Sequence, residues 1–221
     1  HEEGYVVRVY VVETGSGRSS EFSLNSERLE RSGIMPVSLA DPEQFPAVSR
    51  DEVIIDAIFG TGLRKSPSGA AAAVIRRINA TGAFVISVDV PSGLFCEDNS
   101  GSDRENIVRA SRTITFQFPK LSFMFAGNGE FTGEWEVIDI GLHAETISSR
   151  PTPYHSILRE TVRPMLKGRS KFDHKGRFGH ALLIAGSYGT AGAATLSAGA
   201  PLRPGAGLVT VHPPSASVLA G

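Results

Sequence analysis

The chain has 221 residues, of which 41% are hydrophobic and 20% are charged, and its formal net charge is −1. This composition is typical of a globular protein, and it offers neither a basic surface for nucleic acid nor an apolar run long enough to span a membrane. The single cysteine, Cys96, excludes an internal disulfide and fits a reducing, cytoplasmic compartment.

The beginning of the chain predicts the end of a helix over residues 1–4 and a strand over residues 5–12, which is rich in β-branched side chains. Because a chain rarely starts on the last turn of a helix, we expect an earlier strand and helix to be missing. A short polar helix is predicted over residues 25–31, a short strand over residues 37–39 and a loop over residues 41–50.

Two buried strands that end in aspartates follow. Residues 53–62 read VIIDAIFGTG and residues 85–93 read VISVDVPSG, with a helical pattern over residues 70–81 between them. A strand-helix-strand unit makes the two strands parallel. Ligands bind outside the carboxyl ends of such strands, so we expect Asp56 and Asp89 to face one crevice.

The turn after the second strand is expected to present the Asp89 carboxylate and the Ser92 hydroxyl on one side. Together with Asp56, these oxygens suit a hard cation. A partly buried Asp89 could instead act as a general base. The structural alternatives are a helix-capping or turn-forming Asp56 and an ordinary β-turn at the second aspartate.

The loop GTGLRK at residues 60–65 has backbone N–H groups and two cations that could hold a phosphate, although it matches neither a P-loop nor GxGxxG. Arg64 and Lys65 could equally be solvated. Lys120, after a strand and Pro119, could reach the crevice, but we interpret it as an ordinary exposed lysine.

The remaining elements are predicted in chain order: strands 113–118 and 135–140, a linker 144–153, a helix 157–166, a strand 181–185, a glycine-rich turn, a helix 191–200 and a strand 207–212. The domain prediction is one domain over residues 1–143, a linker over 144–156 and part of a second domain over 157–221.

Several segments resemble a known pair of domains. Four segments resemble the NAD(P)HX epimerase domain: DAIFGTGL (56–63), VDVPSG (88–93), TFQFPKLSF (115–123) and EWEVIDIGL (134–142). Two later segments resemble the start of the ADP-dependent NAD(P)HX dehydratase domain: HKGRFGHALLIAGSYGTAGAATLSA (174–198) and GAGLVTV (205–211). This order is that of the bifunctional enzyme that repairs hydrated NADH and NADPH.

The resemblance implies an α/β fold, with a Rossmann-like three-layer epimerase domain followed by the start of a ribokinase-like domain. It implies epimerisation of the R and S hydrates by the first domain. The second domain would dehydrate the S hydrate with ADP, or with ATP in some members. Epimerisation requires ring opening or carbanion-like chemistry, hence a carboxylate that moves a proton.

The resemblance also implies roles for single residues. Asp56 and Ser92 match potassium ligands, and Asp89 matches the substrate-contacting, catalytic aspartate. Ala193 matches a substrate contact of the dehydratase. The substrate-binding loop is matched by Gly60, Thr61, Gly62, Leu63, Arg64, Lys65 and Ser66, with lysine in some relatives where Arg64 stands.

The family's Asn- and Gly-rich loop is expected upstream of His1, and its nucleotide site beyond Gly221. We therefore expect this chain as it stands to have no dehydratase activity and impaired or no epimerase activity. A homo-oligomer is expected. The alternative functions are a ribokinase-like small-molecule kinase and a non-catalytic nucleotide- or protein-binding module.

Overall fold

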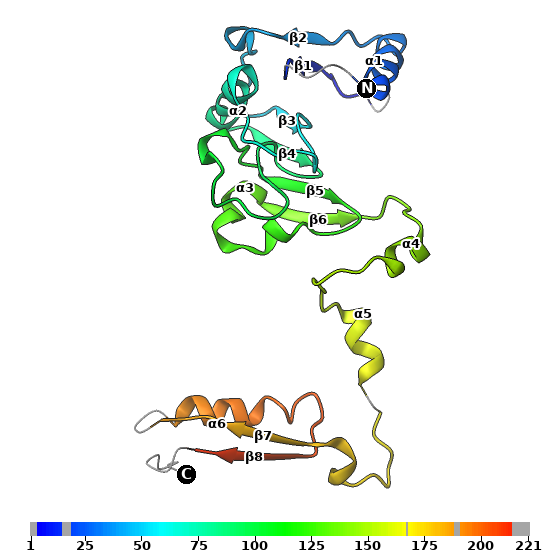
Figure 1. Cartoon of the computed structure of the whole chain (residues 1–221), viewed down its shortest axis with the longest axis vertical. Coiled ribbons are helices and arrows are strands. Elements are labelled where there is room, and N and C mark those ends of the chain that lie inside the picture. Colours follow the sequence, from blue (N-terminus) through cyan, green and yellow to red (C-terminus); the bar gives the residue numbers. More distant parts are fainter. Residues whose placement is uncertain (1–3, 15–18, 167, 188–190, 214–221) are drawn as a thin grey trace. The chain divides into compact units, whose positions relative to one another are not determined.

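The structure is a computed structural model that describes residues 4–14, 19–166, 168–187 and 191–213 (Figure 1). Its contacts divide the chain into two compact units, residues 1–150 and residues 151–221. Every strand pair among the described residues is parallel. The predicted α/β class is therefore confirmed, while the predicted helix end at residues 1–4 falls almost entirely outside the described residues.

A four-stranded parallel sheet forms the centre of the first unit. Its strands lie in chain order: β3 (Val53–Asp56), β4 (Phe84–Val88), β5 (Arg112–Phe116) and β6 (Glu134–Ile138). The register aligns the last residue of β3 with Ser87 of β4. The predicted parallel pairing of the two aspartate strands is confirmed, and their carboxyl ends meet at one edge of the sheet.

Helix α2 (Gly69–Thr81) connects the first two strands of this sheet, as predicted. Its buried Val74, Ile75 and Ile78 pack in one cluster with Val85 of β4. Full burial of each aliphatic side chain stabilises the fold by roughly 1.5–3 kcal/mol. The helix ends at a glycine in the left-handed conformation, which returns the chain to the sheet.

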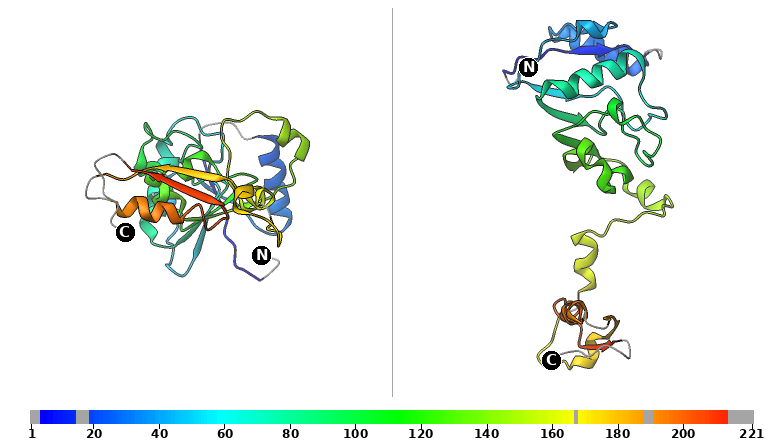
Figure 2. Two further views of the ribbon diagram at one scale, coloured as in Figure 1. Left: turned by 90° about the horizontal axis from the view of Figure 1, so that it is seen from below. Right: turned by 90° about the vertical axis from the view of Figure 1, so that its left-hand side faces the viewer.

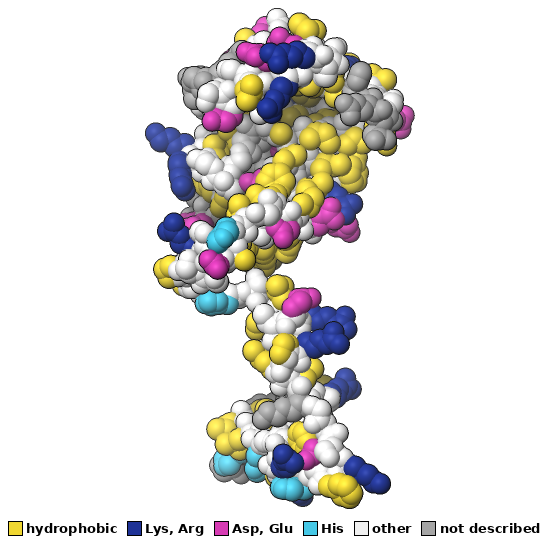
Figure 3. All heavy atoms as spheres, turned by 90° about the vertical axis from the view of Figure 1, so that its right-hand side faces the viewer, with side chains coloured by type: hydrophobic (Ala, Val, Ile, Leu, Met, Phe, Trp, Pro, Cys, Tyr) yellow, Lys and Arg dark blue, Asp and Glu magenta, His cyan; other side chains and the backbone are white. Residues whose placement is uncertain are grey.

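The opposite face of the sheet is open in the described part of the chain. Val53, Ile55, Phe84 and Ile138 keep exposed fractions of 56%, 58%, 49% and 43%. Figure 3 shows apolar side chains gathered in a band on this unit. Parallel sheets normally have both faces covered, and their strands are apolar on both faces. The strands of this sheet have that composition, since apolar side chains also occupy the open face.

A second, two-stranded sheet consists of β1 (Tyr10–Val12) and β2 (Val37–Leu39), connected by helix α1 (Ser20–Arg31). The predicted strand over residues 5–12 is thus shorter than expected. The helix starts five residues earlier than expected because the Ser19 hydroxyl accepts a hydrogen bond from the Phe22 N–H at 3.1 Å and caps it.

The connection after the four-stranded sheet differs from the prediction. Its first residues form helix α4 (Ala144–Ser149) instead of an irregular linker. The predicted helix over residues 157–166 reduces to α5 (Arg159–Val162), followed by a 3₁₀ turn over Arg163–Met165. Pro164 explains the change, because proline has no N–H to continue the α-helical ladder.

The second unit is a strand-helix-strand arrangement, as predicted, with β7 (His180–Ile184), α6 (Gly192–Gly199) and β8 (Leu208–His212). The two strands pair along their whole length, and α6 lies along the pair (Figures 1 and 2). None of the described helices of either unit is long and apolar enough to cross a membrane.

The short helix α3 (Gly129–Thr132) ends at Gly133. A substitution at this glycine tests how closely the first unit is packed. Gly133 has φ 54, and a Cβ there would lie 2.3 Å from the Ser111 carbonyl oxygen. We expect Gly133→Ala to lower the free energy of unfolding by about 2–4 kcal/mol through this clash and the left-handed φ. Urea denaturation measures the change.

Gly127→Ala is the matched control, because a Cβ there meets no atom within 4 Å. It should change stability by at most about 0.5 kcal/mol. Equal effects of the two substitutions would contradict the packing described for Gly133.

Candidate functional site

The carboxylate of Asp56 lies at the carboxyl end of β3 and is only 1% exposed. Its Oδ2 accepts hydrogen bonds from Ser87 Oγ at 2.7 Å and from the Ser92 N–H at 2.9 Å. Its Oδ1 accepts one from Ser92 Oγ at 2.6 Å. The structure therefore brings together Asp56 and Ser92, two of the residues singled out in the sequence.

The turn that carries Ser92 is fixed by close backbone packing. Gly93 has φ 98, and a Cβ there would lie 2.1 Å from the Asn106 carbonyl oxygen. The Val108 N–H donates to the Ser92 carbonyl at 2.9 Å, and the Phe59 N–H donates to Ser92 Oγ at 2.9 Å. Only glycine permits this approach, so the VPSG sequence sets the hydroxyl against Asp56.

Asp56 is a buried carboxylate held by hydrogen bonds alone. No Lys or Arg among the described residues forms an ion pair with it. Besides the N–H donors, the groups around it include the hydroxyl oxygens of Ser87 and Ser92, and the Phe59 carbonyl lies 3.5 Å from Ser92 Oγ. Buried charges in proteins are normally paired or bound to a cation, and carboxylate, hydroxyl and carbonyl oxygens suit a hard one. These residues fit the implied potassium ion.

Asp89, the residue after β4, has an unusual backbone. Its φ is 68, and its N–H donates to the Ile114 carbonyl of β5 at 2.7 Å. A left-handed conformation is uncommon outside glycine, although aspartate tolerates it better than most residues. The conformation turns the chain out of the sheet at the point where the carboxylate stands.

Lys120 pairs with this carboxylate. Its Nζ lies 2.9 Å from Asp89 Oδ1, and the side chains of Lys120 and Asp89 are only 13% and 16% exposed. The same ammonium donates to the carbonyls of Phe116 at 3.0 Å and Phe118 at 3.3 Å. The interpretation of Lys120 as an ordinary exposed lysine is therefore wrong.

The two oxygens of the Asp89 carboxylate have different surroundings. Oδ1 also accepts the Phe116 N–H at 3.2 Å and lies 3.5 Å from Thr115 Oγ1. No hydrogen bond reaches Oδ2 from the part of the chain that the structure describes. A Cβ added to Gly60 would lie 3.8 Å from Oδ2, so this oxygen faces the start of the glycine-rich loop.

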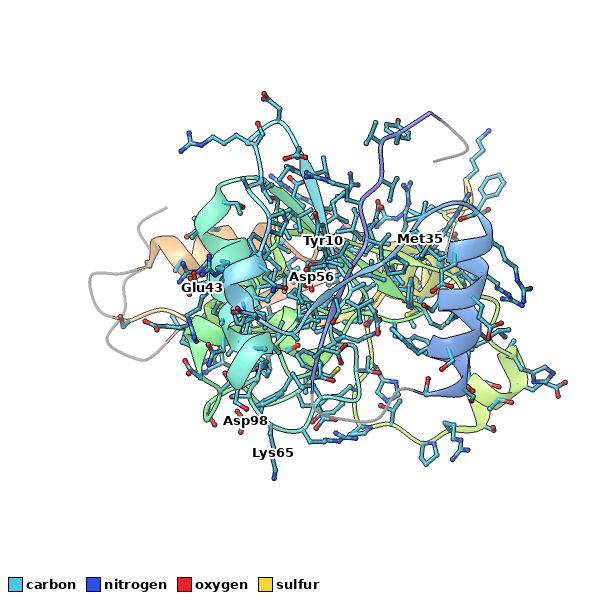
Figure 4. The ribbon with its side chains drawn as sticks, turned by 90° about the horizontal axis from the view of Figure 1, so that it is seen from above. Tyr10, Met35, Glu43, Asp56, Lys65 and Asp98 are labelled. Atoms are coloured by element: carbon cyan, nitrogen blue, oxygen red, sulfur yellow. The ribbon has the colours of Figure 1, made fainter. Side chains whose placement is uncertain are left out.

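The glycine-rich loop follows β3 and is fastened at its far end. Ser66 Oγ accepts the Asp103 N–H at 3.0 Å, and the Leu63 N–H donates to the Gly60 carbonyl at 3.4 Å. Lys65 extends outward at the periphery, whereas Asp56 lies inside (Figure 4). The side chain of Lys65 is thus solvated in this conformation, as the structural alternative for it held.

Cys96, which the sequence analysis considered only as the single cysteine of the chain, is a neighbour of the site. Its Sγ lies 4.0 Å from the Thr61 carbonyl, and it packs against the core cluster formed by Val90, Leu94, Ile107, Phe123 and Phe131. Burial raises the pKa of the thiol. The charge of Lys120 has a smaller effect that lowers this pKa, and the charge of Asp89 has a smaller effect that raises it.

Two further features involve none of these residues. Ala193 belongs to α6 in the second unit and is exposed, while Ala194 beside it is buried. A hollow of about 560 Å³ in the first unit is lined by residues 4–10, 33–35 and 37, without any residue singled out in the sequence. We place the candidate site at the strand ends because the convergent charged groups are there.

Comparison with curated proteins gives consistent relatives. The chain is 37% identical to the bifunctional NAD(P)H-hydrate repair enzyme Nnr of Moorella thermoacetica, over 74% of this chain and 30% of that protein. It is 33% identical to the protein of the same name from Coxiella burnetii, over 96% of this chain and 42% of that protein. An NAD(P)H-hydrate epimerase of Rhodopirellula baltica is 27% identical, over 65% of this chain and 58% of that protein.

The chain thus spans less than two thirds of each of these relatives. A family profile gives the assignment for the first unit. The profile described as YjeF-related protein N-terminus matches residues 1–122, which is more than half of the chain. The strand-end aspartates, the glycine-rich loop and Lys120 all lie inside this match, and the chain belongs to the YjeF-related protein N-terminus family.

Proposed function

We propose that the first unit epimerises hydrated NADH and NADPH, interconverting their R and S forms. The observation that carries the proposal is the Asp89 carboxylate, held by Lys120 at Oδ1 and facing the Gly60 loop with Oδ2. Family membership and the names of the relatives support it. A carboxylate with one fixed and one open oxygen suits proton transfer.

The chemistry follows from the substrate. Water adds to a dihydronicotinamide ring with its oxygen on the carbon next to the ring nitrogen, which makes a hemiaminal. On ring opening, the hydroxyl proton passes to Asp89, the O–H electron pair forms the carbonyl, and the C–N pair goes to nitrogen, which takes a proton from solvent. Closure on the other face of the carbonyl reverses these transfers and inverts the centre.

The other residues of the site have binding roles in this proposal. The loop of Gly60, Thr61, Gly62, Leu63, Arg64, Lys65 and Ser66 would wrap the dinucleotide, with backbone N–H groups and two cations for its phosphates. Asp56 and Ser92 would hold potassium. The bound ion would neutralise the buried carboxylate and give the pyrophosphate a positive partner.

For the second unit we propose the start of an ADP-dependent NAD(P)HX dehydratase domain of ribokinase-like fold. Its support is the strand-helix-strand arrangement of β7, α6 and β8 and the Coxiella burnetii relative, whose match extends over 96% of this chain. Ala193 would contact the substrate of that reaction, and ADP or ATP would be the phosphate donor.

The role of Asp89 predicts a loss of epimerisation without loss of fold. In the full-length protein, Asp89→Asn should lower the kcat of epimerisation by about 10²–10⁴-fold, because it removes the proton-transfer group. The measurement follows NADH absorbance in a mixture of both hydrates, ADP and an added S-specific dehydratase. Wild type should recover both hydrates, and the variant only the S form.

Asp98→Asn is the matched control, since Asp98 is an exposed carboxylate at the periphery of the unit (Figure 4). It should leave the rate unchanged. Recovery of only the S form by wild type would contradict the proposed epimerase, and full activity of Asp89→Asn would contradict the catalytic role of that residue.

The cation site predicts a salt-specific effect on stability. Thermal unfolding in potassium chloride should occur at a higher temperature than in tetramethylammonium chloride of equal concentration, because binding to the native state stabilises it. The expected rise is about 2–4 °C for each kcal/mol of binding linkage. Asp56→Asn should remove the difference, whereas Asp98→Asn should keep it. Equal melting temperatures of wild type in both salts would exclude potassium binding at this site.

A further inference from the structure

We propose that Lys120 is a positioning residue for the epimerisation: it holds Asp89 Oδ1 so that Oδ2 alone exchanges a proton with the substrate. This inference rests on the proposed function and adds a residue to it. Its starting point is the contact of two nearly buried, oppositely charged side chains at the ends of neighbouring strands, 2.9 Å apart.

The ammonium of Lys120 has no free donor. A lysine has three N–H groups. Here Nζ meets three acceptors: Asp89 Oδ1 at 2.9 Å, the Phe116 carbonyl at 3.0 Å and the Phe118 carbonyl at 3.3 Å. A group so occupied cannot contact the substrate without giving up one of these bonds. Its effect on the reaction must therefore pass through the carboxylate.

The backbone around Lys120 is shaped to receive the ammonium. Gln117 lies between the two accepting carbonyls with φ 61, a left-handed conformation outside glycine. Its N–H donates to the Ile138 carbonyl at 2.7 Å, and its side-chain oxygen accepts the Ile140 N–H at 3.1 Å. These bonds tie the strained turn to the last residue of β6 and to the segment just after it, so the acceptors of Lys120 are fixed before any substrate binds.

The division of the Asp89 carboxylate follows from this arrangement. Lys120, the Phe116 N–H and Thr115 Oγ1 all approach Oδ1. Oδ2 is left facing Gly60, whose missing side chain keeps space beside it. A reacting hydroxyl on the loop side therefore meets Oδ2, and rotation of the carboxylate is opposed by the ion pair.

The alternative is that Lys120 only fastens the turn at residues 116–118. A fastening role would change stability or KM, and its effect on the rate would not depend on Asp89. A positioning role predicts a change in kcat that disappears once Asp89 has lost its carboxylate. A double-mutant cycle separates the two.

The experiment compares wild type, Lys120→Met, Asp89→Asn and the double variant in the full-length protein, with kcat and KM for epimerisation of the R hydrate. Lys120→Met should lower kcat by about 10–100-fold with KM within about twofold, as expected when a catalytic group is misplaced. The double variant should match Asp89→Asn. Independent, multiplying effects on kcat, or a change in KM alone, would overturn the proposal.

Arg112→Met is the matched control, because Arg112 is on β5 and forms a surface ion pair with Glu136 at 2.9 Å. It should leave kcat unchanged. Lys120→Arg, which keeps the charge, should retain more kcat than Lys120→Met. If Lys120→Met does not fold, the measurement on Lys120→Arg is used instead. A wild-type kcat with a raised KM in Lys120→Arg overturns the proposal, and a lowered kcat with an unchanged KM supports it.

A second readout does not need epimerase activity. Alkylation of Cys96 by iodoacetamide at pH 8 is followed by mass spectrometry of its peptide. The Lys120 charge lowers the pKa of this thiol and the Asp89 charge raises it, so Lys120→Met should slow alkylation and Asp89→Asn should accelerate it.

The two readouts separate the possible failures. An inactive wild type with the expected alkylation changes would reject the proposed function while keeping the charge arrangement. An active wild type with unchanged kcat in Lys120→Met would reject the positioning role alone. Unchanged alkylation in both variants would reject the arrangement itself.

Discussion

The buried hydrogen bonds between Asp56 and the turn after β4 are the constraint on which the site depends. Parallel pairing brings the end of β3 beside Ser87, and the Asp56 carboxylate then holds both Ser87 and Ser92. Because Ser92 lies three residues after Asp89, fixing one fixes the course of the other. Breaking these bonds would leave a buried charge unsatisfied, which costs about 1–3 kcal/mol or more.

The two strand-end carboxylates have been given different surroundings. Asp56 is enclosed by hydroxyl and N–H groups, without a cationic side chain among the described residues, whereas Asp89 has Lys120 on one oxygen and space on the other. Pairs of carboxylates in contrasting environments commonly divide binding and proton transfer between them. The division proposed above would place the ion beside the enclosed Asp56 and the reacting oxygen of Asp89 toward the Gly60 loop.

The sequence predicted the strands, helix α2 and the meeting of Asp56 with Ser92, because these follow from local patterns and from parallel topology. It did not predict the burial of Lys120. The acceptors of Lys120 are two backbone carbonyls and a carboxylate from another strand, and no spacing of side chains reveals them. The early start of α1 differs from this case, because the sequence does contain its signal. Ser19 is a local N-cap residue, and the predicted helix did not take it into account.

The left-handed residues after β4 and β5 show where the fold accepts strain for the site. Asp89 and Gln117 each follow the last residue of a strand closely, and each costs of order 1–3 kcal/mol relative to glycine. Glycine at either position would relax the backbone. Glycine at 89 would remove the carboxylate, and glycine at 117 would remove the side-chain bond to the Ile140 N–H, just after β6, that steadies the acceptors of Lys120. The backbone strain at Asp89 and Gln117 is therefore the cost of holding the Asp89 carboxylate and the Lys120 ammonium in fixed orientations against each other.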